Sequence, residues 1–167
     1  MLQNPILPMG YKMQIPKPVK TKKKKVKKPV KLTLTKLRAI EKKKIKKLTK
    51  ENKALCSQIC RLQWNGICPI CGKQGSAAHH FFGWKACSNA RYISDNLAWL
   101  CYGCHIGKVH QQGLTEPVRE KIIERIGIER FEALKTEAYK VKKWTLDELK
   151  KTKEELLTEL EYWSVPF

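Results

Sequence analysis

The chain has 167 residues, the size of one ordinary domain with a tail, and a formal net charge of +20. Its first 55 residues hold 19 Lys or Arg against two acids, a net charge of +17, so the basic charge is concentrated at the N-terminal end. No stretch approaches the ~18 uninterrupted apolar residues of a membrane span, and the N-terminus lacks the apolar core of a secretory signal. We therefore expect neither an integral membrane protein nor a secreted one, and we place the chain in the cytoplasm.

Residues 1–35 form the first predicted region, a basic arm. They contain five prolines and a run of lysines between Lys22 and Lys28 that is broken only at Val26. Proline blocks helix formation and like charges repel, so we expect residues 1–35 to be disordered when free.

Residues 36–65 are predicted to form one long helix that is basic in its first half. Apolar residues such as Leu37, Leu48 and Leu55 recur at helical spacings, and lysines fill many of the positions between them. The dipeptide Asn65-Gly66 suits the end of this helix, because both residues tolerate the left-handed backbone conformation.

Residues 66–113 are dense in glycine, cysteine and histidine, and residues 114–167 return to helical patterns. Thr115 and Pro117 favour a helix start, and Gly127 favours a break before a second helix at about 129–140. A last helix is expected at about 146–162. Its start combines a capping box, Thr145 with Glu148, and a hydrophobic staple, Trp144 with Leu149.

The cysteines indicate a structural zinc site. Cys68 and Cys71 form one Cys-x-x-Cys pair, and Cys101 and Cys104 form a second. Two such turns supply the four thiolates of a tetrahedral Zn²⁺ site. The alternatives are a redox pair or coincidental buried thiols. The other three cysteines are interpreted as small apolar residues or an incidental loop thiol, and they are Cys56, Cys60 and Cys87.

All four histidines of the chain fall in the region that the zinc would organise. Hydrolysis of a phosphodiester needs a cation to stabilise charge and a base to deprotonate water, and imidazole serves as a metal ligand or as a base near neutral pH. Scattered histidines are otherwise usually surface or packed residues, and that interpretation stays open.

The constellation resembles the HNH, or ββα-metal, nucleases. The resemblance implies that His80 is the general base, that Asn96 orients it, and that His79 and His105 bind Mg²⁺ or Mn²⁺. His110 is a further candidate ligand, but it follows His105 by five residues, whereas ligands on one face of an α-helix are three or four apart.

A closer resemblance, to the phage lambda NinG (Rap) recombination protein family, covers about a hundred residues. It rests on Cys68-Pro-Ile-Cys71-Gly, His80, Arg91-Tyr92, Asn96 five residues before Cys101, Cys104, Arg125-Ile126-Gly127 and Trp144-Thr145. The resemblance implies a metal-dependent DNA endonuclease that acts on branched intermediates, such as four-way Holliday junctions, during phage or prophage recombination. For a phage protein, the expected location is the cytoplasm of the bacterial host.

DNA is the partner expected for the basic residues, because lysine acts as a point charge on phosphates. Lysines alone do not distinguish DNA from RNA. Arg91 could clamp a phosphate or pair with an acid such as Asp95. The candidate DNA-binding residues are Lys22, Lys23, Lys24, Lys25, Lys27, Lys28, Lys42, Lys43, Lys44, Lys46, Lys47 and Arg91.

The predicted fold is therefore α+β. A small zinc-stapled ββα-metal core at residues 66–113 is flanked by the basic helix and by C-terminal helices. A homodimer would suit paired cuts, although no residue specifies one. One alternative function is a non-catalytic, zinc-stapled DNA- or RNA-binding recombination accessory protein. Another is a partner-binding factor of the recombination or replication machinery that docks through the C-terminal helices.

Overall fold

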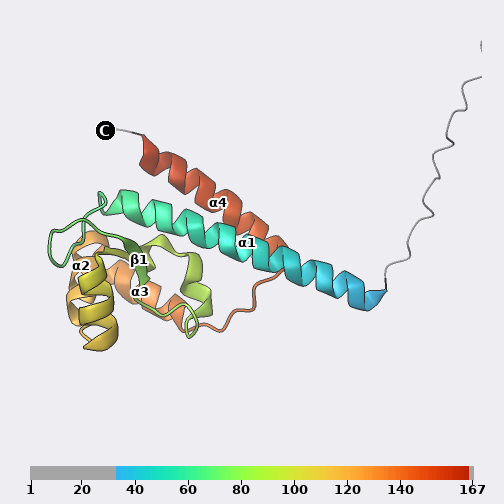
Figure 1. The fold of residues 1–167 in the computed structure, drawn as a ribbon, viewed down its shortest axis with the longest axis horizontal. Helices are drawn as coiled ribbons and strands as arrows, with labels where there is room; N and C mark the ends of the chain where they lie inside the picture. The colour runs from blue at the N-terminus through green and yellow to red at the C-terminus, as the bar shows by residue number, and fades with distance from the viewer. Residues whose placement is uncertain (1–32, 166–167) are drawn as a thin grey trace, which may run out of the picture. The chain divides into compact units, whose positions relative to one another are not determined.

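The computed structural model describes residues 33–165, and the fold is α+β, mostly helical with one small two-stranded sheet (Figure 1). The predicted lysines at 22–28 and most of the predicted arm lie outside these residues. The elements in chain order are α1 (Leu34–Gln63), β1 (Ala77–His80), η1 (Ser88–Tyr92), η2 (Ser94–Asn96), β2 (Leu97–Leu100), η3 (Gly103–Gln111), α2 (Glu116–Ile126), α3 (Ile128–Ala138) and α4 (Leu146–Ser164).

Helix α1 begins two residues before the predicted start, because Thr33 caps it. The Thr33 hydroxyl accepts a hydrogen bond from the backbone N–H of Lys36 at 3.4 Å. The predicted stop is confirmed: Asn65 and Gly66 have φ angles of 52° and 69°, and the Gly66 N–H donates to the Arg61 carbonyl at 2.7 Å. Asn65 and Gly66, both in the left-handed backbone conformation, turn the chain from the helix into the first cysteine turn.

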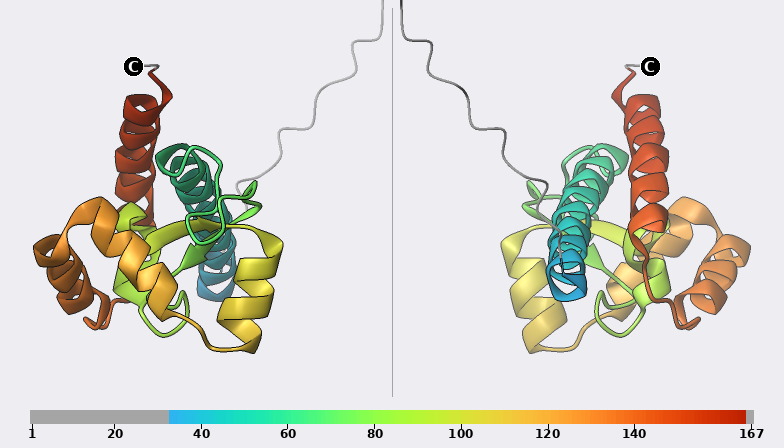
Figure 2. Two further views of the ribbon diagram at one scale, coloured as in Figure 1. Left: turned by 90° about the vertical axis from the view of Figure 1, so that its left-hand side faces the viewer. Right: turned by 90° about the vertical axis from the view of Figure 1, so that its right-hand side faces the viewer.

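Helix α4 lies beside the second half of α1 and runs in the same direction (Figures 1 and 2). The Asn52 side chain donates to the Leu149 carbonyl at 2.9 Å, and Lys153 pairs with Glu51 at 2.9 Å. Between the helices and the sheet lies an apolar cluster of buried residues, which are Cys56, Ile59, Cys60, Tyr92, Leu97, Trp99, Leu149 and Leu156. Cys56 and Cys60 thus serve as small packed side chains, as their helical spacing indicates.

The two strands pair antiparallel, with His79 opposite Ala98 and His80 opposite Leu97. All four residues of β2 are buried, because a core cluster lies on each of its faces. Successive strand residues point to opposite faces. Leu97 and Trp99 accordingly pack with the α1–α4 cluster, whereas Ala98 and Leu100 pack with the second cluster, which includes residues of α2 and α3.

The second cluster brings Phe131 of α3 together with Val118 and Ile122 of α2. Gly127, with φ of 82°, separates these two helices. Cys87 is also buried in this cluster, so it is a packed residue of the core and not only a loop thiol.

The predicted capping box of the last helix is confirmed. The Glu148 carboxylate accepts from the Thr145 N–H at 2.9 Å, and the Thr145 hydroxyl accepts from the Glu148 N–H at 3.3 Å. Trp144 and Leu149 belong to one apolar cluster, as the staple requires. Across residues 33–165, none of the helices combines the length and the apolar character that crossing a membrane requires.

Candidate functional site

The two Cys-x-x-Cys turns meet in space. The four sulfur atoms of Cys68, Cys71, Cys101 and Cys104 lie within 4.8 Å of one another. In the first turn the Gly72 N–H donates to the Cys68 carbonyl at 2.9 Å, and Gly72 takes the φ of 70° that this tight bend requires. The cluster could therefore hold a metal ion such as zinc, as the sequence predicts.

Backbone hydrogen bonding favours the metal-binding form of one thiol. The Cys104 N–H donates to the Cys101 sulfur at 3.4 Å, and this contact is the main cause that lowers the pKa of Cys101 to about 7. The sulfur atoms of Cys71 and Cys101 are 3.5 Å apart. Burial, by contrast, raises the pKa of Cys104 to about 12. Thiolates, rather than thiols, are the metal ligands, so Cys101 is the thiol of this turn that is already favoured as a ligand.

A second cluster consists of three histidines from two elements. His79 lies on β1, His105 and His110 lie on η3, and their ring nitrogens are within 4.8 Å of one another. The segment η3 is a π-helix, in which each turn is wider than in an α-helix. Residues five apart therefore return to the same face. The five-residue spacing from His105 to His110, which disfavours a shared face on an α-helix, brings the two rings together on this π-helix.

Burial favours the neutral form of two histidines of the cluster, His79 and His105. His79 is 8% exposed, and burial, followed by the neighbouring imidazoles, lowers its pKa to about 4. Burial also lowers the pKa of His105. Neutral imidazole is the form that binds metals. Three nitrogen donors fit a transition-metal ion such as Zn²⁺ or Ni²⁺ better than Mg²⁺, which prefers oxygen ligands.

His80 follows His79 on β1, but it has different neighbours. Its Nε2 lies 3.1 Å from the Arg91 carbonyl oxygen, and its ring meets the ring of Trp84 edge-on at 5.1 Å between centroids. A carbonyl only accepts, so Nε2 carries the hydrogen and the free lone pair is on Nδ1. Burial lowers the pKa of His80, which favours the neutral ring.

Asn96 is buried and anchors the loop between the strands. Its Oδ1 accepts from the Phe82 N–H at 2.7 Å, and its Nδ2 donates to the carbonyls of Phe82 and Ala90, each at 3.0 Å. Ala90 directly precedes Arg91, whose carbonyl meets His80. Asn96 therefore contacts the loop backbone and reaches His80 through that loop.

Arg91 does not pair with Asp95, so that alternative is wrong. Its Nε donates to the Trp84 carbonyl at 2.8 Å, and its guanidinium lies over the Trp84 ring at 5.4 Å. Asp95 pairs instead with Arg125 and Arg130, at 3.6 and 2.5 Å. These two arginines, on α2 and α3, lie 30 and 35 residues after Asp95 and meet it only in the folded chain.

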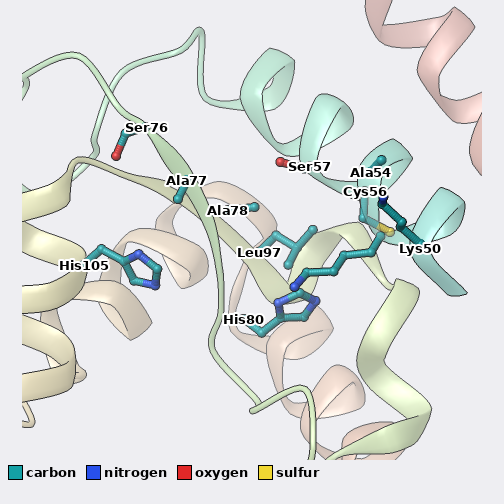
Figure 3. Close-up of a pocket in the computed structure, with 11 residues that line it drawn as sticks. Lys50, Ala54, Cys56, Ser57, Ser76, Ala77, Ala78, His80, Leu97 and His105 are labelled. Carbon is teal, nitrogen blue, oxygen red and sulfur yellow. The ribbon is translucent and has the colours of Figure 1, made fainter.

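A pocket of about 460 Å³ lies between α1 and β1 and has both His80 and His105 in its wall (Figure 3). Its α1 side includes Lys50 and Lys53, which the sequence interpretation did not single out. The signal in the sequence was weak, because these two lysines are part of a continuous basic helix. The predicted lysines at 42, 43, 44, 46 and 47 are exposed on α1.

Comparisons with known proteins give one match. No curated protein and no solved structure matches the chain. A family model described as the bacteriophage lambda NinG protein matches residues 9–162, which include both ligand clusters and every helix from α1 to α3. This match extends over nearly the whole chain and agrees with the resemblance seen in the cysteine turns. The chain therefore belongs to the phage lambda NinG family, which implies a phage protein related to recombination.

Proposed function

We propose that this protein is a metal-dependent DNA endonuclease of the HNH type that cuts branched recombination intermediates. The observation that carries the proposal is the pocket between α1 and β1, whose wall contains both His80 and His105. A phosphodiester in this pocket would meet a candidate base and a candidate metal ligand at once.

His80 is suited to accept the proton of the attacking water. The Arg91 carbonyl fixes the hydrogen on Nε2 and leaves Nδ1 as the basic atom. The lowered pKa keeps the ring neutral near pH 7, so the base is in its active form. Asn96 acts as a positioning residue, because it holds the loop that presents the Arg91 carbonyl.

The three-histidine cluster is the proposed site of the catalytic ion. A divalent ion there would stabilise the charge that develops on the phosphate. His79 comes from β1, and His105 and His110 come from η3, so the site depends on how these two elements are placed relative to each other. The donor set leads us to propose that Mn²⁺ or Zn²⁺ supports cleavage better than Mg²⁺.

Branched DNA is proposed as the substrate because the chain belongs to the NinG family and because α1 presents an exposed row of lysines. Lysine contacts with phosphates carry no information about the base sequence, so they suit a protein that recognises the shape of the DNA. The cysteine cluster would act as a structural zinc site in the same region.

The test is a cleavage assay on linear, forked and four-way DNA of matched sequence, with Mn²⁺, Zn²⁺ or Mg²⁺ added. The wild type should cut branched DNA. His80→Ala should lose cleavage by at least about 100-fold, in the range that general-base catalysis contributes, and keep DNA binding. The triple variant His79→Ala, His105→Ala and His110→Ala should also lose cleavage while retaining one zinc per chain on the four cysteines.

Two outcomes would count against the proposal. Equal loss of binding and cleavage in His80→Ala would remove the catalytic assignment of that residue. Tight binding without cleavage by the wild type, with every metal and every substrate, would instead support the non-catalytic, zinc-stapled DNA-binding protein.

A further inference from the structure

The pocket between α1 and β1 combines an apolar wall with charged side chains that are all basic. Its charged or ionisable side chains besides Cys56 are Lys50, Lys53, His80 and His105, and no carboxylate is part of its wall. Ser57 and Ser76 add two hydroxyl groups. Phosphate oxygens are bound by lysines, hydroxyls and similar donors.

Four pocket residues of α1 form one stripe on the helix. Lys50, Lys53, Ala54 and Ser57 follow the spacing i, i+3, i+4 and i+7, which places them on the same face. Figure 3 shows Lys50, Ala54 and Ser57 along α1, with His80 and Leu97 across the pocket from them. The small side chains at 54 and 57 leave space between the helix and the strand.

The ion pairs of α1 lie elsewhere. Glu51 pairs with Lys47 at 3.8 Å and with Lys153 of α4 at 2.9 Å. Within residues 33–165, neither Lys50 nor Lys53 has a carboxylate within 4.0 Å. The Lys53 Nζ lies 5.3 Å from the centroid of the Trp84 ring, which packs against His80. Lys53 therefore lies near the candidate base, and Lys50 lines the same pocket.

We infer that Lys50 and Lys53 bind a backbone phosphate of the DNA strand that enters the pocket, and that they hold this strand between α1 and β1 beside His80. This inference rests on the proposed function for the position of the bond to be cut. A pocket of about 460 Å³ falls within the ~300–1,000 Å³ of typical ligand sites, so it can admit a segment of one strand. Helix α1 then binds the DNA strand in the pocket, in addition to attracting DNA through its other lysines.

The first experiment compares two double variants that remove the same charge. Lys50→Gln with Lys53→Gln removes the pocket lysines, and Lys143→Gln with Lys151→Gln removes two exposed lysines away from the pocket. Each pair of substitutions is made in two backgrounds. Cleavage is measured in the wild-type background, and binding to forked DNA across a salt series is measured in the His80→Ala background.

The pocket pair should lower kcat/KM by about tenfold per lysine, the scale of one charge-assisted hydrogen bond. It should also reduce the slope of log K against log salt by about 0.7 to 0.9, the contribution of the one phosphate that the two lysines share. The control pair should change both quantities much less. Equal effects of the two pairs would overturn the inference.

A second variant tests the pocket without changing charge. Ala54→Phe adds a ring to the pocket stripe at an exposed position, and Ala39→Phe adds the same ring to an exposed position of α1 outside the pocket. Ala54→Phe should reduce cleavage at least tenfold with an unchanged melting temperature and zinc content, whereas Ala39→Phe should cut normally. Normal cleavage by Ala54→Phe would overturn the inference.

The two proposals fail in different ways. If the wild type cuts DNA and the pocket variants cut equally well, the lysine site fails and the endonuclease proposal stands. If the wild type cuts no DNA but the pocket pair still reduces the salt slope selectively, the phosphate site stands and the endonuclease proposal fails.

Discussion

His105 and His110 lie five residues apart on η3, and their Nε2 atoms are 3.1 Å apart. The π-helix produces this proximity, since its hydrogen bonds join residues five apart, as in the Gln112 N–H to the Gly107 carbonyl at 3.2 Å. The extra width per turn brings both rings toward His79 of β1. A three-nitrogen cluster therefore arises from one strand residue and one irregular helix.

His110→Ala should weaken metal binding at the histidine cluster by at least about 100-fold. Loss of an outer hydrogen-bond partner of a ligand already reduces metal affinity by about 10- to 100-fold, and loss of a ligand itself should do more. Titration calorimetry with Mn²⁺ or Co²⁺, on protein whose cysteine cluster is loaded with zinc, measures this affinity. Gln111→Ala is the control, because Gln111 is the exposed next residue. Equal affinity of His110→Ala and the control would remove His110 from the site.

Cys104→Ser should release the structural metal and destabilise the fold by several kcal/mol. Structural zinc contributes about 10–16 kcal/mol of apparent binding free energy in zinc-finger peptides, so losing one of four thiolates removes much of it. Metal content and thermal unfolding are the measurements. Cys87→Ala is the control, since it removes a buried thiol outside the cluster. It should keep one zinc per chain, and zinc retention by Cys104→Ser would contradict the assignment.

Asn96→Ala should lower the free energy of unfolding by about 3 kcal/mol or more. The substitution leaves the Phe82 N–H and two loop carbonyls without their partner, and each buried unsatisfied group costs about 1–3 kcal/mol. Chemical denaturation measures the loss. Cleavage should fall as well, because Asn96 holds the loop that presents the Arg91 carbonyl to His80. A variant as stable as the wild type would show that the loop does not depend on Asn96.

Cleavage should persist below pH 6.5. Burial lowers the pKa of His80 from its ordinary value of 6.5, and the base is active only when it is neutral. More than half of the activity is therefore retained at pH 6.5, and activity is lost as the pH falls through the lowered pKa. The measurement is kcat/KM against pH at a fixed metal occupancy. A midpoint at or above pH 6.5 would contradict the assignment of His80 as the base.

Asp95→Asn should destabilise the protein by about 3 kcal/mol. The substitution leaves the Arg125 guanidinium, whose side chain is 17% exposed, without its counter-charge, and a broken buried pair typically costs about 3–5 kcal/mol. Urea denaturation provides the measurement. Asp147→Asn is the matched control, since Asp147 is 89% exposed in its pair with Lys150 and its loss should change stability by less than about 0.5 kcal/mol. Equal stabilities of the two variants would show that Asp95 does not balance Arg125.

The sequence by itself determined the local features of this protein. The helix caps at Thr145 and Glu148, the stop at Asn65 and the two cysteine turns are each specified by residues that are close together in the chain. Hydrogen bonds and backbone preferences over a few residues decide such features, so they can be predicted from the residues alone.

The tertiary structure decided which side chains meet. His110 joins the cluster only because η3 is a π-helix, and Asp95 pairs with Arg125 and Arg130 instead of Arg91. Lys50 and Lys53 line one pocket with His80 because α1 packs on the sheet. Each of these relations depends on the width of a helix turn or on contacts between elements distant in the chain. Helical periodicity alone does not determine those quantities, because they depend on how the two apolar clusters pack around β2.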